Sequence, residues 1–181
     1  MEQLKQLLTG ELQDLLHAEM QLVQALPKMA EAAHHPKLQE LINKHLQQTE
    51  GHVERLRKVF ELLGEKAQPK ACKGMRGLIE EGEETIEEHE GEEEVAADLA
   101  LIAAAQKVEH YEIAGYGTAR ALARQIGERE IATLLSHTLG EEESSDYLLT
   151  ELSKPLLQDA STTDTTPARV AHVAKSKSRR A

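Results

Sequence analysis

Acidic side chains interrupt the hydrophobic stripes of several predicted helices at regular helical spacing. Glu19 stands in one stripe, Glu109 and Glu112 share a second, and Glu142 and Asp146 share a third. Residues that recur every three to four positions lie on one face of a helix, and an apolar face packs into the core. We therefore expect these carboxylates to point into the interior of a helical protein.

A fourth stripe, within residues 38–63, is broken by histidines. His52 and Gln48 interrupt its middle, and His45 lies two helical turns before His52. We expect His52 to face the carboxylates as a metal ligand, and His45 to be a supporting or core histidine. Imidazole beside carboxylates is a donor combination that transition metals bind.

These polar residues lie at one level along the predicted helices. Glu19 precedes the turn near residue 34, and His52 follows it, by a similar length of chain, about four to five helical turns. Glu112 and Glu142 lie at equal distances before and after the turn near residue 127, about four helical turns from it. At about 1.5 Å of rise per residue, these side chains are roughly 22 to 28 Å from their turns. Packed side by side, the helices would bring them to a common midpoint.

Several buried carboxylates with little counter-charge would either take up protons or recruit a cation. Oxygen and imidazole donors without thiolate suit iron, with manganese as the alternative. We therefore predict two bound metal ions. The predicted ligands are Glu19, His52, Glu109, Glu112, Glu142 and Asp146. The opposing hypothesis is that the acids are solvated, or are paired with Lys107 or Arg120.

Apolar periodicity predicts an all-α fold. The predicted helices cover residues 4–33, 38–63, 93–126 and 128–157, and a short helix lies within the connection 65–91. Gly64 and Gly127 stand where helix C-caps are expected, and Pro27 is expected to kink or break the first helix. Two helical hairpins joined by a long crossover predict a ferritin-like four-helix bundle.

Composition supports one helical domain, over residues 1–159. The chain has 181 residues, a single Phe, no Trp and a net charge of −11. The negative charge disfavours general nucleic-acid binding by the folded body. The single Cys72 can form no internal disulfide, and we take it as a structural thiol. The N-terminus lacks a signal-peptide pattern and no run is apolar enough for a membrane span, so we expect a cytoplasmic protein.

The last residues, 160–181, are expected to form a disordered basic tail. Ser, Thr and Pro dominate its start, and residues 167–181 carry five Lys and Arg and no Asp or Glu. Such a tail serves solubility. Weak contact with nucleic acid is the alternative, because isolated cations attract phosphates without reading sequence.

The chain resembles the ferritin-like stress-protein family of the YciE/YciF type over about residues 3 to 157. The resemblance rests on segments 30–34, 52–56 and 77–81, and above all on 103–117, AAAQKVEHYEIAGYG. Two shorter segments, Glu19-Met20-Gln21 and residues 109–112, are similar to ligand motifs of rubrerythrins. The resemblance implies a bacterial stress-associated homodimer with a di-iron centre that handles peroxide or oxygen.

The sequence departs from the wider di-iron pattern in the second and fourth helices. A Glu-x-x-His motif ending at His52 would need an acid at Thr49, and the neighbouring Gln48 is not an acid either. The fourth helix has Asp146 where the pattern often has a histidine. With one fewer anionic ligand, one of the two sites is weaker, so a mononuclear or half-occupied centre is the alternative to two bound ions. The alternatives to an oxidoreductase are a protein that sequesters metal without turnover and a metal-free helical adaptor.

Overall fold

The computed structural model describes residues 1–89, 91 and 93–163, and in these residues it contains helices and no strand. The helices are α1 (Glu2–Ala32), α2 (Pro36–Leu63), α3 (Lys73–Glu88), α4 (Glu94–Ile126) and α5 (Arg129–Thr163). The predicted all-α fold is confirmed. Within the described part of the chain, no helix has both the length and the apolar composition needed to cross a membrane.

Gly64 and Gly127 end two helices at the positions that the sequence predicts. Gly64 follows α2 with φ 69°, and Gly127 follows α4 with φ 89°. These left-handed conformations are unfavourable for residues with a Cβ atom, so glycine terminates both helices. At the start of α2, the Nδ1 atom of His35 accepts a hydrogen bond from the backbone N–H of Lys37 (3.1 Å). Short turns after α1 and α4 therefore produce two hairpins.

Two helix boundaries differ from the predictions. α1 passes through Pro27 to Ala32 as one helix, because Leu26 and Ala30 on either side of the exposed proline are both buried in the core. α5 continues past residue 157 to Thr163, and residues 158–163 contain no Gly or Pro that would end it. Residues 160–163, which the sequence assigns to the basic tail, are thus helical. The rest of the predicted tail lies outside the described residues.

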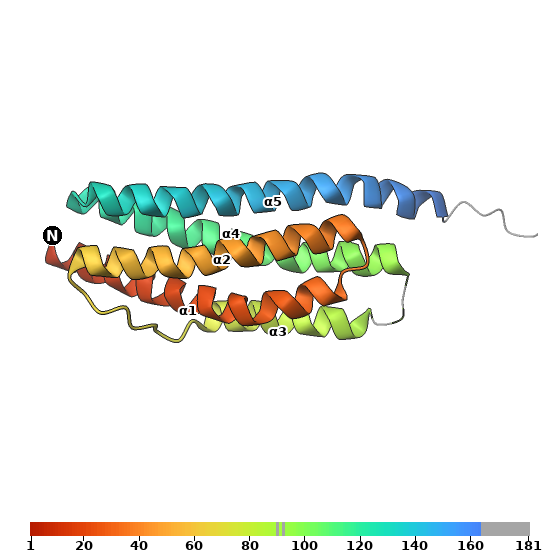
Figure 1. The fold of residues 1–181 in the computed structure, drawn as a ribbon, viewed down its shortest axis with the longest axis horizontal. Helices are drawn as coiled ribbons and strands as arrows, with labels where there is room; N and C mark the ends of the chain where they lie inside the picture. Colours follow the sequence, from red (N-terminus) through yellow and green to blue (C-terminus); the bar gives the residue numbers. More distant parts are fainter. Residues whose placement is uncertain (90, 92, 164–181) are drawn as a thin grey trace, which may run out of the picture.

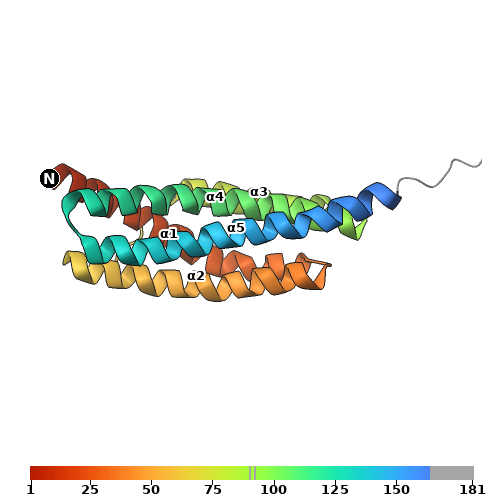
Figure 2. The ribbon, with the colours of Figure 1, turned by 90° about the horizontal axis from the view of Figure 1, so that it is seen from above.

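The four long helices form a ring in which each contacts two neighbours (Figures 1 and 2). α1 packs against α2 and α4, and α5 packs against the same two helices from the other side. The chain crosses from one hairpin to the other through α3, which packs against α1 and α4. Two antiparallel hairpins joined by this crossover make the bundle ferritin-like, as predicted.

A small polar cluster attaches the start of α3 to the bundle. The hydroxyl of Tyr111 donates a hydrogen bond to the Asp14 carboxylate (2.5 Å) and lies 2.9 Å from Cys72 Sγ. The same sulfur accepts from the backbone N–H of Met75 at the first turn of α3 (3.4 Å). A Cβ atom on Gly74 would lie 2.7 Å from the Tyr111 ring, so glycine allows this close approach. Cys72 and Tyr111 thus have structural partners.

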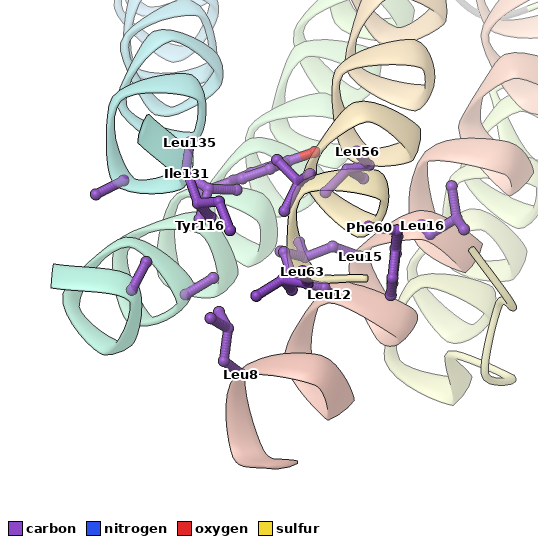
Figure 3. Close-up of a cluster of buried hydrophobic side chains, with 14 of the residues drawn as sticks. Leu8, Leu12, Leu15, Leu16, Leu56, Phe60, Leu63, Tyr116, Ile131 and Leu135 are labelled. Carbon is purple, nitrogen blue, oxygen red and sulfur yellow. The ribbon is translucent and has the colours of Figure 1, made fainter. Parts of the chain in front are cut away.

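Two apolar clusters fill the bundle, one on each side of a layer of buried acids and histidines. We call it the polar layer, and it contains Glu19, His45, His52, Glu109, Glu112 and Glu142. The first apolar cluster, near the N-terminus of α1 (Figure 3), includes Leu8, Leu12, Leu15, Leu56, Phe60, Leu63, Tyr116, Ile131 and Leu135. The second apolar cluster, toward the other end, includes Leu22, Leu26, Leu38, Ile42, Leu101, Ile102, Leu149 and Leu152. The polar layer between them therefore lies in the middle of the molecule.

Candidate metal centre

Six ionisable side chains from all four long helices meet in the polar layer. They are Glu19 of α1, His45 and His52 of α2, Glu109 and Glu112 of α4, and Glu142 of α5, and all six are buried. Along each of these helices, apolar core residues lie both before and after the polar positions. The packing of the two apolar clusters therefore holds these acids and imidazoles together.

The six side chains form two groups that share Glu142. In the first group, one donor atom from each of His45, Glu109, Glu112 and Glu142 lies within 4.8 Å of the others. In the second, the same holds for Glu19, His52 and Glu142. We call these groups the His45 half-site and the His52 half-site. A carboxylate shared by two groups has two oxygens and can bridge two metal ions.

Short contacts define the His52 half-site. His52 Nδ1 lies 2.9 Å from Glu142 Oε1 and 3.3 Å from Glu19 Oε1. The hydroxyl of Tyr116 donates a hydrogen bond to Glu19 Oε1. On the other side of the imidazole ring, His52 Nε2 lies 3.0 Å from Glu141 Oε2. The ring thus spans the distance between the buried carboxylates and a carboxylate nearer the surface.

Glu141 fixes the orientation of this imidazole. A carboxylate oxygen can only accept, so His52 Nε2 must donate to Glu141 and Nδ1 faces the buried carboxylates. Glu141 is itself held by Arg55, whose Nη1 donates to Glu141 Oε2 (2.8 Å) and to Thr138 Oγ1 (2.6 Å). Metal-binding histidines in proteins are oriented by such carboxylates.

The His45 half-site has fewer close contacts. His45 Nε2 lies 3.3 Å from Glu109 Oε1 and 3.8 Å from Glu142 Oε2, and His45 Nδ1 lies 3.0 Å from Ser145 Oγ. The backbone oxygen of His45 accepts a hydrogen bond from Thr49 (3.0 Å). Ser145 therefore supports the ring from behind, while Nε2 is directed toward the carboxylates.

Among the described residues, the buried polar atoms without a hydrogen bond all belong to these six side chains. In the described part of the chain, the buried side-chain nitrogens and oxygens without a well-aligned hydrogen bond are Glu19 Oε2, His45 Nε2, His52 Nδ1, Glu109 Oε2 and both carboxylate oxygens of Glu112 and Glu142. Of these, His52 Nδ1 and Glu142 Oε1 still face each other in the ion-pair contact described above. Leaving a buried polar group unpaired costs about 1–3 kcal/mol, and more when it is charged. A cation would satisfy several of these donor atoms at once, so the donor set fits a metal centre.

Burial and neighbouring charges shift the pKa values of Glu109, Glu112, His45 and His52 when no cation is bound. Burial, followed by neighbouring carboxylates, raises the pKa of Glu109 and of Glu112 well above the usual 4.5. Burial lowers the pKa of His45. Burial also opposes charge on His52, but its contacts with Glu142 and Glu19 outweigh this and raise its pKa to about 10. The two imidazoles therefore differ in charge.

Five of the six predicted ligands are brought together, and Asp146 is not. Its carboxylate accepts a hydrogen bond from Gln106 (2.8 Å) and lies 3.4 Å from His110 Nε2, outside both groups of close donor atoms. The buried stripe of α5 passes instead through Ser145, which contacts His45. The prediction that Asp146 points into the layer is therefore wrong: the inward position on α5 is one residue earlier, at Ser145.

His45 joins the group although the sequence analysis assigned it only a supporting role. The buried stripe of α2 runs through residues 42, 45, 49, 52 and 56, so it includes Thr49 and leaves Gln48 partly exposed. The signal was present, because His45 and His52 are separated by about two helical turns and so share a face of α2. α2 thus contributes two imidazoles and no carboxylate.

Sequence and structure comparisons agree with this fold. A model of the family described as a domain of unknown function (DUF892) matches residues 3–162. Protein YciF of Escherichia coli (strain K12) is 48% identical over 143 residues, which cover 78% of this chain and 85% of YciF. Both matches span most of the helical bundle.

Solved structures are similar over comparable lengths. The crystal structure of the E. coli stress protein YciF matches with a TM-score of 0.82 and 43% identity, covering 87% of this chain and 99% of that one. YcfI from Rhodopseudomonas palustris matches with a TM-score of 0.77 and 39% identity, covering 81% and 92%. A protein from Xanthomonas campestris pv. campestris, 22% identical with a TM-score of 0.69, shares the fold. The chain therefore belongs to the DUF892 family and is of the YciF type.

Proposed function

We propose that this protein binds two metal ions, with iron as the physiological metal, in the polar layer at the centre of the bundle. One observation carries the proposal: the unpartnered buried polar atoms of the described residues all lie on Glu19, His45, His52, Glu109, Glu112 and Glu142. Hard oxygen donors with imidazole suit iron or manganese. The inward projection of these donors from four helices is the arrangement that di-iron carboxylate bundles use.

Each half-site offers one imidazole and at least two carboxylates to one ion. His45, Glu109 and Glu112 would hold one ion and Glu19 with His52 would hold the other, with Glu142 available to both. Bound iron would supply one-electron redox chemistry and Lewis acidity. The protein positions the donors, and its two apolar clusters keep bulk water from the layer. Glu141 orients His52, and Tyr116 holds Glu19 by a hydrogen bond.

We propose further that the bound metal reacts with peroxide or oxygen. The E. coli relative is described as a stress protein, and oxidant handling is a stress function that a di-iron centre can perform. The competing function is sequestration of metal without turnover. Sequestration requires the same two bound ions but predicts that the iron is not oxidised repeatedly.

The test is metal binding by purified protein, followed by exposure to oxidant. Apoprotein is titrated anaerobically with Fe(II), and bound iron is counted by elemental analysis after desalting. We expect two ions per chain in the wild type. Glu142→Gln removes the shared carboxylate and should lose most of the bound iron. Glu143→Gln changes the next residue, which is exposed, and should bind as the wild type does.

Addition of peroxide to the iron-loaded wild type then separates the two functions. Ascorbate is present in excess as the electron donor, because each peroxide reduced to water takes two electrons. Repeated consumption of peroxide under these conditions supports the oxidoreductase, and a single oxidation of the bound iron supports sequestration. Wild-type protein that retains no iron would refute both. Equal iron binding by Glu142→Gln and Glu143→Gln would place the metal elsewhere.

A further inference from the structure

The two half-sites differ in their access to solvent. Glu19, His52, Glu112 and Glu142 have no exposed surface at all, whereas His45 is 6% exposed and Glu109 is 3% exposed. His45 and Glu109 are also the two members of the centre that line cavities: one opens between α2 and α5 and contains polar side chains, and the other, bordered by α1, α3 and α4, is mostly apolar. Access to the polar layer is therefore confined to its His45 side.

The cavity is a groove that opens between α2 and α5, two helices that lie side by side (Figure 2), and residues of α1 and α4 complete its wall on the inside of the bundle. Leu41, Lys44 and Gln48 line it from α2, and Ser144 and Leu148 line it from α5. Lys44 and Ser144 are exposed at the surface, and Gln48 is half-buried. His45 and Glu109 form the inner end of the groove. Their unpartnered atoms, His45 Nε2 and Glu109 Oε2, are buried there.

We propose that this α2–α5 groove conducts hydrogen peroxide to the His45 half-site. The inference deepens the proposed function by naming the oxidant and its route. Gln48 and Ser144 offer hydrogen-bond donors and acceptors to a small hydroxylated molecule, and Leu41 and Leu148 restrict its size. Peroxide can use these hydrogen bonds, whereas dioxygen cannot.

The charges along the groove argue against a metal ion as its occupant. Among the described residues that line it, the charged side chain at the surface is Lys44, and the acidic one, Glu109, lies at the inner end. A divalent cation approaching from solvent would meet the positive charge first. A neutral oxidant meets no such barrier.

Chemical modification of the metal-free protein tests the route without any turnover. Diethyl pyrocarbonate acylates accessible imidazoles, and peptide mass spectrometry gives the rate at each histidine. We expect His45 to be modified in the wild type. His52 is no reference for access, because its protonated imidazole does not react with this reagent. Gln48→Phe should fill the groove and slow His45 about tenfold. Gln47→Phe, a change of the exposed neighbouring glutamine, should leave the rate unchanged.

A second pair of variants approaches the groove from α5. Ser144→Trp should slow the modification of His45 as Gln48→Phe does, and Glu143→Trp should not. If Gln48→Phe fails to fold, this pair decides the question. Equal rates at His45 in the blocking variants and in their controls would overturn the proposal.

The iron-loaded protein gives the matching kinetic measurement. After anaerobic loading, rapid mixing with peroxide should oxidise the iron about tenfold more slowly in Gln48→Phe than in Gln47→Phe, with equal iron content. Equal oxidation rates would overturn peroxide entry through this groove. Wild-type protein that binds no iron would refute the proposed function instead, while the modification rates of His45 would still decide the accessibility of the groove.

Discussion

The His45 and His52 half-sites are built from the same residue types but are supported differently. In the His52 half-site, the imidazole is held by Glu141 and is positively charged when no metal is bound, since its pKa is raised to about 10. In the His45 half-site, burial lowers the pKa of His45, and Glu109 and Glu112 have no charged partner. The metal-free protein therefore balances charge on one side and retains protons on the other.

The difference shows how one buried layer can combine stability with access. Glu19 and Glu142 are neutralised in part by His52 and are fully buried. The carboxylates beside His45 depend on protons or a cation, and this side lines the α2–α5 groove. We expect the His52 half-site to act mainly in structure and metal retention, and the His45 half-site to meet the oxidant.

The largest effect on iron binding is expected from the removal of either imidazole. His45→Ala and His52→Ala should each retain one iron ion instead of two, because each variant keeps an intact half-site with Glu142. His110→Ala, at an exposed histidine, is the control. Elemental analysis measures the iron content. Loss of both ions in both variants would show that the half-sites do not bind independently.

The pH dependence of the metal-free protein should report the uncompensated acids. A carboxyl group whose pKa is higher in the folded state stabilises the fold while protonated, so stability falls as pH rises above the ordinary value of 4.5 toward the raised pKa. The raised pKa of His52 acts in the same direction between 6.5 and about 10. The lowered pKa of His45 acts in the opposite direction, but only below 6.5.

We therefore expect the free energy of unfolding of the apoprotein to fall from about pH 6.5 to about pH 9, by up to about 1.4 kcal/mol per pH unit for each titrating group. The melting temperature should fall with it. Calorimetry across this range measures the change. Glu112→Gln cannot ionise at this position and should remove the contribution of Glu112 to the loss of stability, which begins above pH 4.5. The iron-loaded protein should show little of this pH dependence. An apoprotein whose stability rises between pH 6.5 and pH 9 would contradict the raised pKa of His52.

Removal of the carboxylate behind His52 should affect one half-site more than the other. Glu141→Ala leaves His52 Nε2 without its acceptor, and loss of such a partner typically weakens metal binding about 10- to 100-fold. Stepwise Fe(II) titration should show one weakened binding event and one unchanged. Glu143→Ala is the control. Two equally weakened events would mean that Glu141 acts on the layer as a whole.

The smallest effect is expected at Asp146. Asp146→Asn keeps the hydrogen bond to Gln106 and changes no residue of the polar layer. Iron content and affinity should stay at the wild-type values in the same titration. A lost ion would restore Asp146 to the ligand set that the sequence predicts.

The sequence was informative about the elements and about the level at which their polar residues meet. Gly64 and Gly127 marked the two helix ends because only glycine readily adopts the left-handed conformation found there. Glu19, Glu112 and Glu142 could be found because each interrupts an otherwise apolar stripe. These features depend on local conformation and on helical periodicity, which a sequence contains directly.

The remaining residues depended on the rotation of each helix about its axis. In α5, an inward position at 145 or at 146 continues the spacing from Glu142 equally well, and the packing of α5 against its neighbours selects Ser145. In α2 the same ambiguity concerned Gln48 and Thr49. The roles of Glu141 and Arg55 depend on contacts between helices distant in sequence, so periodicity carried no signal for them.

The outward position of Asp146 has a consequence for the valence of the ions that the layer can accept. The two half-sites together contain four carboxylates, those of Glu19, Glu109, Glu112 and Glu142, whose formal charges sum to −4 when all are ionised. Two divalent cations balance that sum, whereas two monovalent cations leave an excess of −2 and two trivalent cations an excess of +2. An uncompensated charge between two apolar clusters is unfavourable. Electroneutrality alone would therefore favour a divalent pair, and a fifth inward acid would have removed that preference.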